Sequence, residues 1–148
     1  RPPHWMFDDA LAFTMLHDVR VRPHGSGGVL LEQMSKIWNV MTRFDVSHAE
    51  WHPYWKNGEL VTTPSDSVKA SLYLTPASAG QAARTLMVVS NLSKQEAPDA
   101  RVQLNLARLG LPNGAAAKDA LTGQSLKLEQ GQLAVPLSPM RMRLVWVE

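Results

Sequence analysis

Residues 68–74, "VKASLYL", alternate apolar with more polar side chains, and this pattern recurs through the second half of the chain. The apolar residues at even positions alternate with Lys69, Ser71 and Tyr73. Successive side chains of a β-strand point to opposite faces, so a period of two is typical of a strand that buries one face. The stretch therefore predicts a half-buried β-strand.

Other segments repeat this period. Residues 101–106 and 140–146 alternate apolar with polar side chains in the same way. Residues 84–92, "RTLMVVSNL", are instead mostly apolar, which is typical of a strand buried on both faces. Two shorter strands, 124–130 and 132–137, are predicted to form a hairpin around Gln130-Gly131. About six or seven short antiparallel strands predict a β-sandwich over residues 58–148. Its core is expected to contain Leu72, Val88, Leu104, Val135 and Leu144.

Before Asn57-Gly58 the apolar period is helical instead. Residues 30–44 carry apolar side chains at spacings of three and four, which is the stripe of an amphipathic helix. Residues 8–18, "DDALAFTMLHD", also suit a helix with an aspartate cap, although "LHDVRV" suits a short strand equally well. "GSGG" at 25–28 is expected to be a flexible link between the two. The sequence thus predicts two parts, residues 1–57 and residues 58–148.

Composition excludes several classes of function. The 148 residues are 45% hydrophobic and 19% charged, which is typical of a globular protein. The net charge of +2 comes from dispersed residues, so no nucleic-acid partner is expected. The chain has no cysteine, and its five histidines form no metal-binding motif, so we expect no metal and no cofactor. No apolar run approaches the roughly 20 residues that span a bilayer, so no membrane partner is expected.

The segment 49–55, "AEWHPYW", concentrates aromatic and titratable side chains. Aromatic faces stack on the C–H faces of sugar rings, while a neighbouring acid or histidine binds the hydroxyl groups. The candidate substrate-binding residues are therefore Glu50, Trp51, His52 and Tyr54. The alternative is that the segment plugs a core between a helix and a sheet.

Pro53 is expected to turn this segment so that Trp51 and Trp55 point apart. We expect Trp51 to line a cleft and Trp55 to be the buried plug. Catalytic residues stay unknown, because no nucleophile motif such as G-x-S-x-G is present.

The order of these parts resembles the last portion of a large glycoside hydrolase. The order of a strand-like "LHDVRVRP", the helix with "KIWNVMTRFDV", the segment "AEWHPYW" and a sandwich ending in "MRLVWVE" is similar to glycoside hydrolase family 123-like proteins and related bacterial proteins. The closing strands with "DALTG" also look like the C-terminal domains of amylase- and galactosidase-like enzymes. The resemblance implies closing elements of a TIM barrel over residues 1–57, followed by a C-terminal β-sandwich. In that family an adjacent Asp-Glu pair is catalytic, and no such dipeptide occurs in this sequence.

The fold class implied is mainly β, with a C-terminal antiparallel β-sandwich preceded by α/β elements resembling the end of a TIM barrel. The expected function is support of the catalytic barrel of a glycoside hydrolase, with a part in lining its glycan cleft. The alternatives are a non-catalytic carbohydrate-binding module and a structural interaction domain. The first residue is Arg1, which agrees with a fragment that is not catalytic alone. Expected partners are carbohydrate and the rest of the parent chain or a second copy, and a periplasmic or extracellular parent is favoured.

Overall fold

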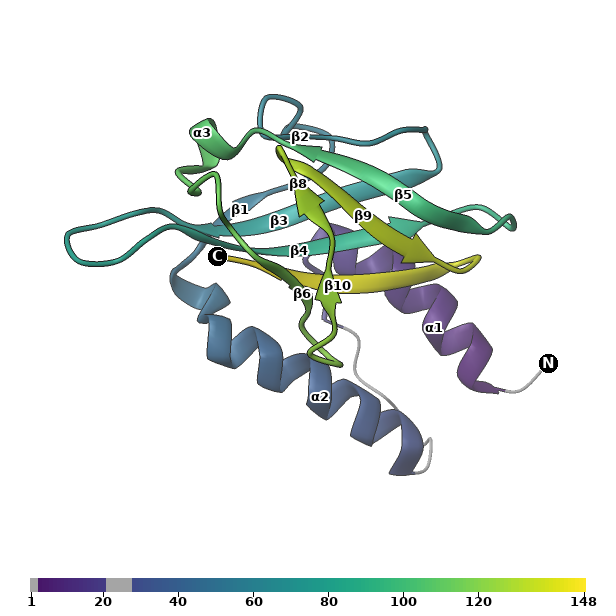
Figure 1. The fold of residues 1–148 in the computed structure, drawn as a ribbon. Helices are drawn as coiled ribbons and strands as arrows, with labels where there is room; N and C mark the ends of the chain where they lie inside the picture. The colour runs from purple at the N-terminus through teal and green to yellow at the C-terminus, as the bar shows by residue number, and fades with distance from the viewer. Residues whose placement is uncertain (1–2, 21–27) are drawn as a thin grey trace.

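The computed structural model describes residues 3–20 and 28–148 and is mainly β (Figure 1). The helical elements are α1 (Pro3–Thr14), η1 (Met15–His17), α2 (Gly28–Phe44), η2 (Val46–His48) and α3 (Leu106–Leu109). The strands are β1 (Glu50–His52), β2 (Val61–Thr62), β3 (Val68–Thr75), β4 (Arg84–Asn91), β5 (Ala97–Leu104), β6 (Ala117–Asp119), β7 (Ser125–Leu126), β8 (Leu128–Glu129), β9 (Gln132–Leu137) and β10 (Arg141–Val147).

The strands form two antiparallel sheets. One has six strands in the order β1-β3-β4-β10-β6-β7, and the other has four in the order β2-β5-β9-β8. An apolar core with residues from both sheets lies between them, and it includes Leu72, Leu104 and Val135 as expected. The prediction of antiparallel strands after Gly58 is confirmed, and in β5 and β9 buried side chains alternate with more exposed ones.

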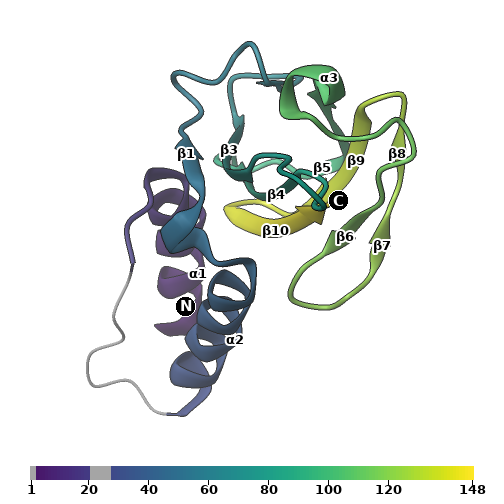
Figure 2. The ribbon, with the colours of Figure 1, turned by 90° about the vertical axis from the view of Figure 1, so that its left-hand side faces the viewer.

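A second core lies on the opposite face of the six-stranded sheet, where α1, η1 and α2 pack (Figures 1 and 2). This core contains Leu11 from α1 and Leu16 from η1, together with Ile37 and Phe44 from α2. The expectation that β3 is buried on one face only is wrong. All residues of β3 from Ala70 to Leu74 are buried, because one face meets the other sheet and the opposite face meets the helices.

Two residues predicted for the core of the β-sandwich lie instead in the core under this helical layer. Val88 and Leu144 are fully buried, but they belong to the core under the helices and not to the core between the sheets. Trp146 has the same parity on β10 as Leu144, and both side chains face the helical layer. On β10 the core between the sheets instead receives Val145 and Val147. Parity separates the two faces of a strand correctly, but it does not say which neighbour covers each face.

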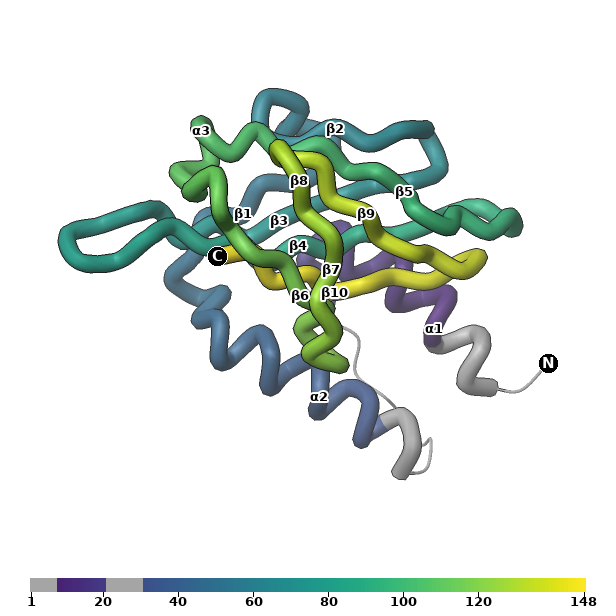
Figure 3. The backbone as a smooth tube through the Cα atoms, in the orientation of Figure 1, coloured from purple at the N-terminus to yellow at the C-terminus, as the bar shows by residue number. Residues whose placement is uncertain are grey.

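The two sheets are joined at one edge by residues that pass from one sheet to the other. The predicted strand 124–130 is divided into β7, in the six-stranded sheet, and β8, in the four-stranded sheet (Figure 3). The predicted hairpin between β8 and β9 is confirmed. Gln130 and Gly131 have φ angles of 51° and 80°, as a two-residue turn with both central residues left-handed requires.

The N-terminal part contains helices and one edge strand. The helix predicted for residues 30–44 is confirmed as α2, and the helix predicted from residue 8 is confirmed as α1. The alternative prediction of a strand in "LHDVRV" is wrong for Leu16 and His17, which lie in η1. Most of the predicted "GSGG" link lies within residues 21–27, outside the described residues. Every strand pair in residues 3–20 and 28–148 is antiparallel, so this part of the chain shows no barrel elements. No helix described is long and apolar enough to cross a membrane.

Candidate functional site

The predicted site residues begin on β1, which is the edge strand of the six-stranded sheet. Glu50 and His52 share one face of this strand, and the His52 ring nitrogen Nε2 lies 3.0 Å from Glu50 Oε2. Trp51 points to the other face, where its ring packs 4.7 Å from the ring of Tyr73. The edge strand therefore divides these three residues between its two faces.

Tyr54 and Trp55 lie in the turn that follows β1. Trp55 is 51% exposed, whereas Trp51 is partly buried against the core under the helices. The expectation that Trp55 is the buried plug is wrong. The turn does separate the two tryptophans, but it is Trp51 that reaches the helical core, because its parity on β1 matches that of Tyr73.

Four rings from distant parts of the sequence form an aromatic row (Phe13, His17, Tyr54 and Trp55). The His17 ring stacks on Trp55 at 5.3 Å with an interplanar angle of 25°, and the Phe13 ring lies 4.6 Å from His17, tilted by 39°. Tyr54 meets His17 and Trp55 edge-on, at 5.6 and 5.1 Å. The exposed fractions of Phe13 and Trp55, 54% and 51%, leave part of each ring open to solvent.

Sequence reasoning found Tyr54 but missed Phe13 and His17. These two residues are four apart at the end of the first helical segment, a spacing that places both on one helix face. That spacing is a signal for a paired aromatic surface, but only the packing of η1 beside residues 53–56 brings it to Trp55.

Ser71 and Asn57 hold the aromatic row in position. The buried Ser71 hydroxyl accepts a hydrogen bond from the Tyr54 backbone N–H at 3.0 Å and donates to the Leu16 carbonyl at 2.8 Å. The buried Asn57 side chain donates to the carbonyls of His52 and Ala70. One sheet residue thereby connects the two chain segments that carry the rings.

Tyr73 continues the aromatic packing inward and does not form part of the exposed row. Its hydroxyl donates to Asp18 Oδ1, and the side chain is almost fully buried. Burial and this carboxylate raise the pKa of Tyr73 far above its usual value. The phenol therefore stays protonated and has a positioning role between η1 and β3.

A groove runs along one face of α2. It encloses about 630 Å³ and is lined by Arg20, Leu31, Trp38, Met41, Thr42, Asp45, Val46 and Ser47. Leu31 is 54% exposed, and Trp38 is partly buried at the edge of the helical core. Four of the lining residues are apolar, and the other four are polar or charged.

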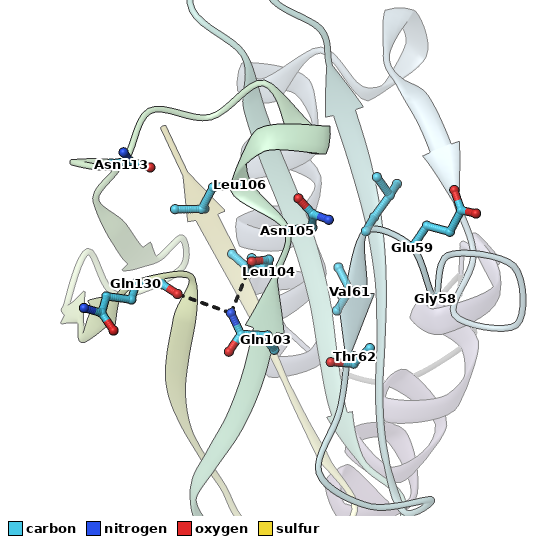
Figure 4. Close-up of a pocket in the computed structure, with 11 residues that line it drawn as sticks. Gly58, Glu59, Val61, Thr62, Gln103, Leu104, Asn105, Leu106, Asn113 and Gln130 are labelled. Carbon is cyan, nitrogen blue, oxygen red and sulfur yellow. Dashed lines mark hydrogen bonds between the residues drawn. The ribbon is translucent and has the colours of Figure 1, made fainter.

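A second hollow, of about 720 Å³, lies at the end of the four-stranded sheet (Figure 4). Four carboxamide side chains line it, from Gln103, Asn105, Asn113 and Gln130, together with Glu59, Thr62 and four aliphatic residues including Leu104. The carboxamides are exposed, and Glu59 pairs with Arg108 at 2.6 Å. The hollow has no aromatic surface among its lining residues.

Asp45, Ser47 and His48 form a hydrogen-bonded cluster after the end of α2. His48 Nδ1 lies 2.9 Å from Asp45 Oδ1, which also accepts from the Ser47 hydroxyl at 2.8 Å. The hydrogen bond and charge of Asp45 raise the pKa of His48 above its usual 6.5, and the hydrogen bond from His48 holds the pKa of Asp45 below its usual 3.8. Serine and aspartate both approach the same ring nitrogen, so the cluster is not a hydrolytic triad.

We expect an NMR titration of the His48 ring to give a midpoint above 6.5, and Asp45→Asn to move it back towards 6.5. Because the folded pKa of His48 is raised, its contribution to stability is fully present below pH 6.5 and is lost as the pH rises through the folded value. Asp45 contributes above pH 3.8 and loses its contribution as the pH falls through its lowered folded value. A wild-type midpoint at or below 6.5 would contradict the pairing.

No group of three or more histidine, aspartate or glutamate side chains in residues 3–20 and 28–148 is arranged to hold a metal ion. The two antiparallel sheets and their helical cover define a mainly β domain with exposed aromatic and apolar side chains on its N-terminal elements.

The chain belongs to the glycoside hydrolase 123 C-terminal domain family. The family model described as "Glycoside hydrolase 123, C-terminal domain" matches residues 33–134, which is more than half of the 148 residues. This match confirms the resemblance inferred from the order of elements. Neither a curated protein nor a solved structure matches the chain.

Proposed function

We propose that this domain supports the catalytic barrel of a glycoside hydrolase and is not catalytic alone. Membership of the family associates the chain with glycoside hydrolases, and the observation that carries the support role is the apolar groove along α2. Exposed apolar surface on a folded domain commonly marks the contact with a missing partner. The occupant proposed for the groove is the catalytic region of the parent chain.

The exposed apolar side chains gather on the N-terminal elements. Besides Leu31 in the groove, Phe13, Val19 and Trp55 are each at least half exposed. In this proposal residues 1–57 provide the contact with the barrel through the α2 groove, while residues 58–148 form most of the β-sandwich that holds them. A second copy of the chain is the rival occupant of this surface.

The glycan cleft is the finer part of the proposal. Glu50, Trp51, His52 and Tyr54 remain the substrate-binding candidates, and the exposed Glu50–His52 pair is suited to binding sugar hydroxyl groups. Trp51 is partly buried, so it would support such a site from behind instead of stacking on a sugar.

The substitution Leu31→Lys tests the support role. In the 148-residue chain we expect its free energy of unfolding to change by less than about 0.5 kcal/mol, because Leu31 is 54% exposed. In the full-length parent we expect a loss of about 2 kcal/mol or more, because the docked barrel would bury an unpaired ammonium group. Thermal and urea unfolding of both proteins measure the difference.

The matched control is Leu121→Lys, since Leu121 is also partly exposed but does not line the α2 groove. Its effect on the free energy of unfolding is expected to be the same in the 148-residue chain and in the full-length parent. Equal, small effects of Leu31→Lys in both proteins would refute docking through this groove. Self-association of the short chain that Leu31→Lys abolishes would point instead to a second copy as the occupant.

A further inference from the structure

We propose that the aromatic row (Phe13, His17, Tyr54 and Trp55) is a glycan-binding site in which the open face of Trp55 stacks on a pyranose ring. His17 covers one face of the Trp55 indole, with only 25° between the two planes, and Tyr54 meets the indole edge-on. Since Trp55 remains 51% exposed, part of the indole is open to a ligand. A flat, apolar and partly electron-rich surface of this kind matches the C–H face of a sugar.

Hydrogen bonds position the backbone segments that carry the row. Ser71 fixes the Tyr54 backbone and the Leu16 carbonyl to the same buried hydroxyl, at 3.0 and 2.8 Å. The Lys56 N–H closes the turn onto the Pro53 carbonyl at 2.9 Å. The turn and the end of the first helical segment therefore need no rearrangement of their backbone to present these rings, which favours affinity from a small contact.

Polar groups at the row are suited to hydroxyl groups. His17 Nδ1 lies 2.8 Å from the Phe13 carbonyl, and because a carbonyl can only accept, Nδ1 is the donor. The neutral ring then presents Nε2 as an acceptor. The Lys69 ammonium group lies 5.5 Å from the centre of the Tyr54 ring and adds donors beside the aromatic surface.

The exposure of the row separates it from a packing cluster. The neighbouring pair Trp51 and Tyr73 performs the packing role, with Tyr73 only 3% exposed. A stable protein interface needs about 800 Å² from each partner, whereas a fully covered aromatic ring supplies about 150–250 Å². Rings that are already stacked on one another supply less than this, so the row alone is closer in size to a sugar site than to a protein interface.

The test is a titration of the 148-residue chain with neutral and N-acetylated trisaccharides, namely maltotriose, cellotriose, mannotriose and chitotriose, up to about 10 mM, the range of weak binding. Tryptophan fluorescence and the indole N–H signals of the NMR spectrum report binding. We expect a saturable response to at least one of these glycans. Trp55→Ala should weaken it at least tenfold while leaving the far-ultraviolet circular dichroism unchanged, because Trp55 is exposed.

Asn113→Ala is the matched control, because Asn113 lines the separate carboxamide-rich hollow (Figure 4). It should bind the same glycan as well as the wild type does. No response to any of the four trisaccharides would overturn the proposal, as would a loss of binding with Asn113→Ala but not with Trp55→Ala. The inference uses the proposed function only to choose glycans as ligands, and the Leu31→Lys comparison can fail while this titration succeeds.

Discussion

Replacing Phe44 by alanine is expected to lower the free energy of unfolding by about 3–5 kcal/mol, or roughly 10 °C in Tm. Phe44 is the last residue of α2 and is fully buried. Its ring meets Trp146 edge-on at 5.0 Å and lies 5.1 Å below the Arg84 guanidinium group. The substitution removes these contacts together and leaves a cavity between the helix and the sheet.

The Arg84 side chain limits how far the structure can close the cavity left by the Phe44 ring. Its guanidinium group donates to the Phe44 carbonyl at 2.9 Å, which holds the end of the helix in place even after the side chain is gone. A cavity that cannot close is the costly kind. Urea unfolding at a pH near neutrality measures the change.

Phe13→Ala is the matched control, because it makes the same substitution at a phenylalanine that is 54% exposed. We expect it to cost less than about 1 kcal/mol. If Phe44→Ala cost no more than Phe13→Ala, the packing of α2 on the six-stranded sheet would be contradicted.

The second large effect is expected at Asp119, in the turn between β6 and β7. Its carboxylate accepts hydrogen bonds from the backbone N–H groups of Leu121 and Thr122, at 2.9 and 3.0 Å, and from Arg143 at 2.8 Å. The Asp119 side chain is 5% exposed. Asp119→Ala should therefore lower stability by about 2–3 kcal/mol, because it removes one partner of a largely buried ion pair and the oxygen that accepts from two N–H groups of the turn.

Asp119→Asn separates these two contributions. The amide keeps an oxygen that can accept from the turn, but it loses the charge that pairs with Arg143, so we expect about half the loss seen with alanine. Arg143 is 30% exposed, so water can partly replace the ion pair, and the loss should be smaller than for a fully buried pair. Thermal unfolding of both variants is the measurement, and an alanine variant within about 0.5 kcal/mol of the wild type would refute the role of the turn.

The Asp119 turn also shows what a short motif can mean. "DALTG" was part of the resemblance to glycoside hydrolase C-terminal domains, and the structure gives it a local physical role. Asp119 satisfies the turn, and Gly123 adopts a φ of 77°, where a side chain would be strained. The motif therefore describes how the chain turns between strands and carries no chemistry of its own.

The site was only partly predictable. The density of aromatic residues between 49 and 55 identified a segment that does carry half of the aromatic row. The other half, Phe13 and His17, lies about 40 residues earlier in the chain and is brought close by hydrogen bonds through Ser71. Such a long-range contact has no local pattern in the sequence.

The sequence by itself determined the local elements and the family. Period-two segments became strands, the stripe of residues 30–44 became α2, and Gln130-Gly131 became the hairpin turn, because backbone geometry imposes these periods and φ angles within a few residues. Only the tertiary structure decided which layer covers each strand face. With α1 and α2 covering the six-stranded sheet, Leu144 lies under helices, Trp51 is partly buried and Trp55 is exposed. The apolar character of a side chain predicts that it is buried, but it does not predict which element covers it.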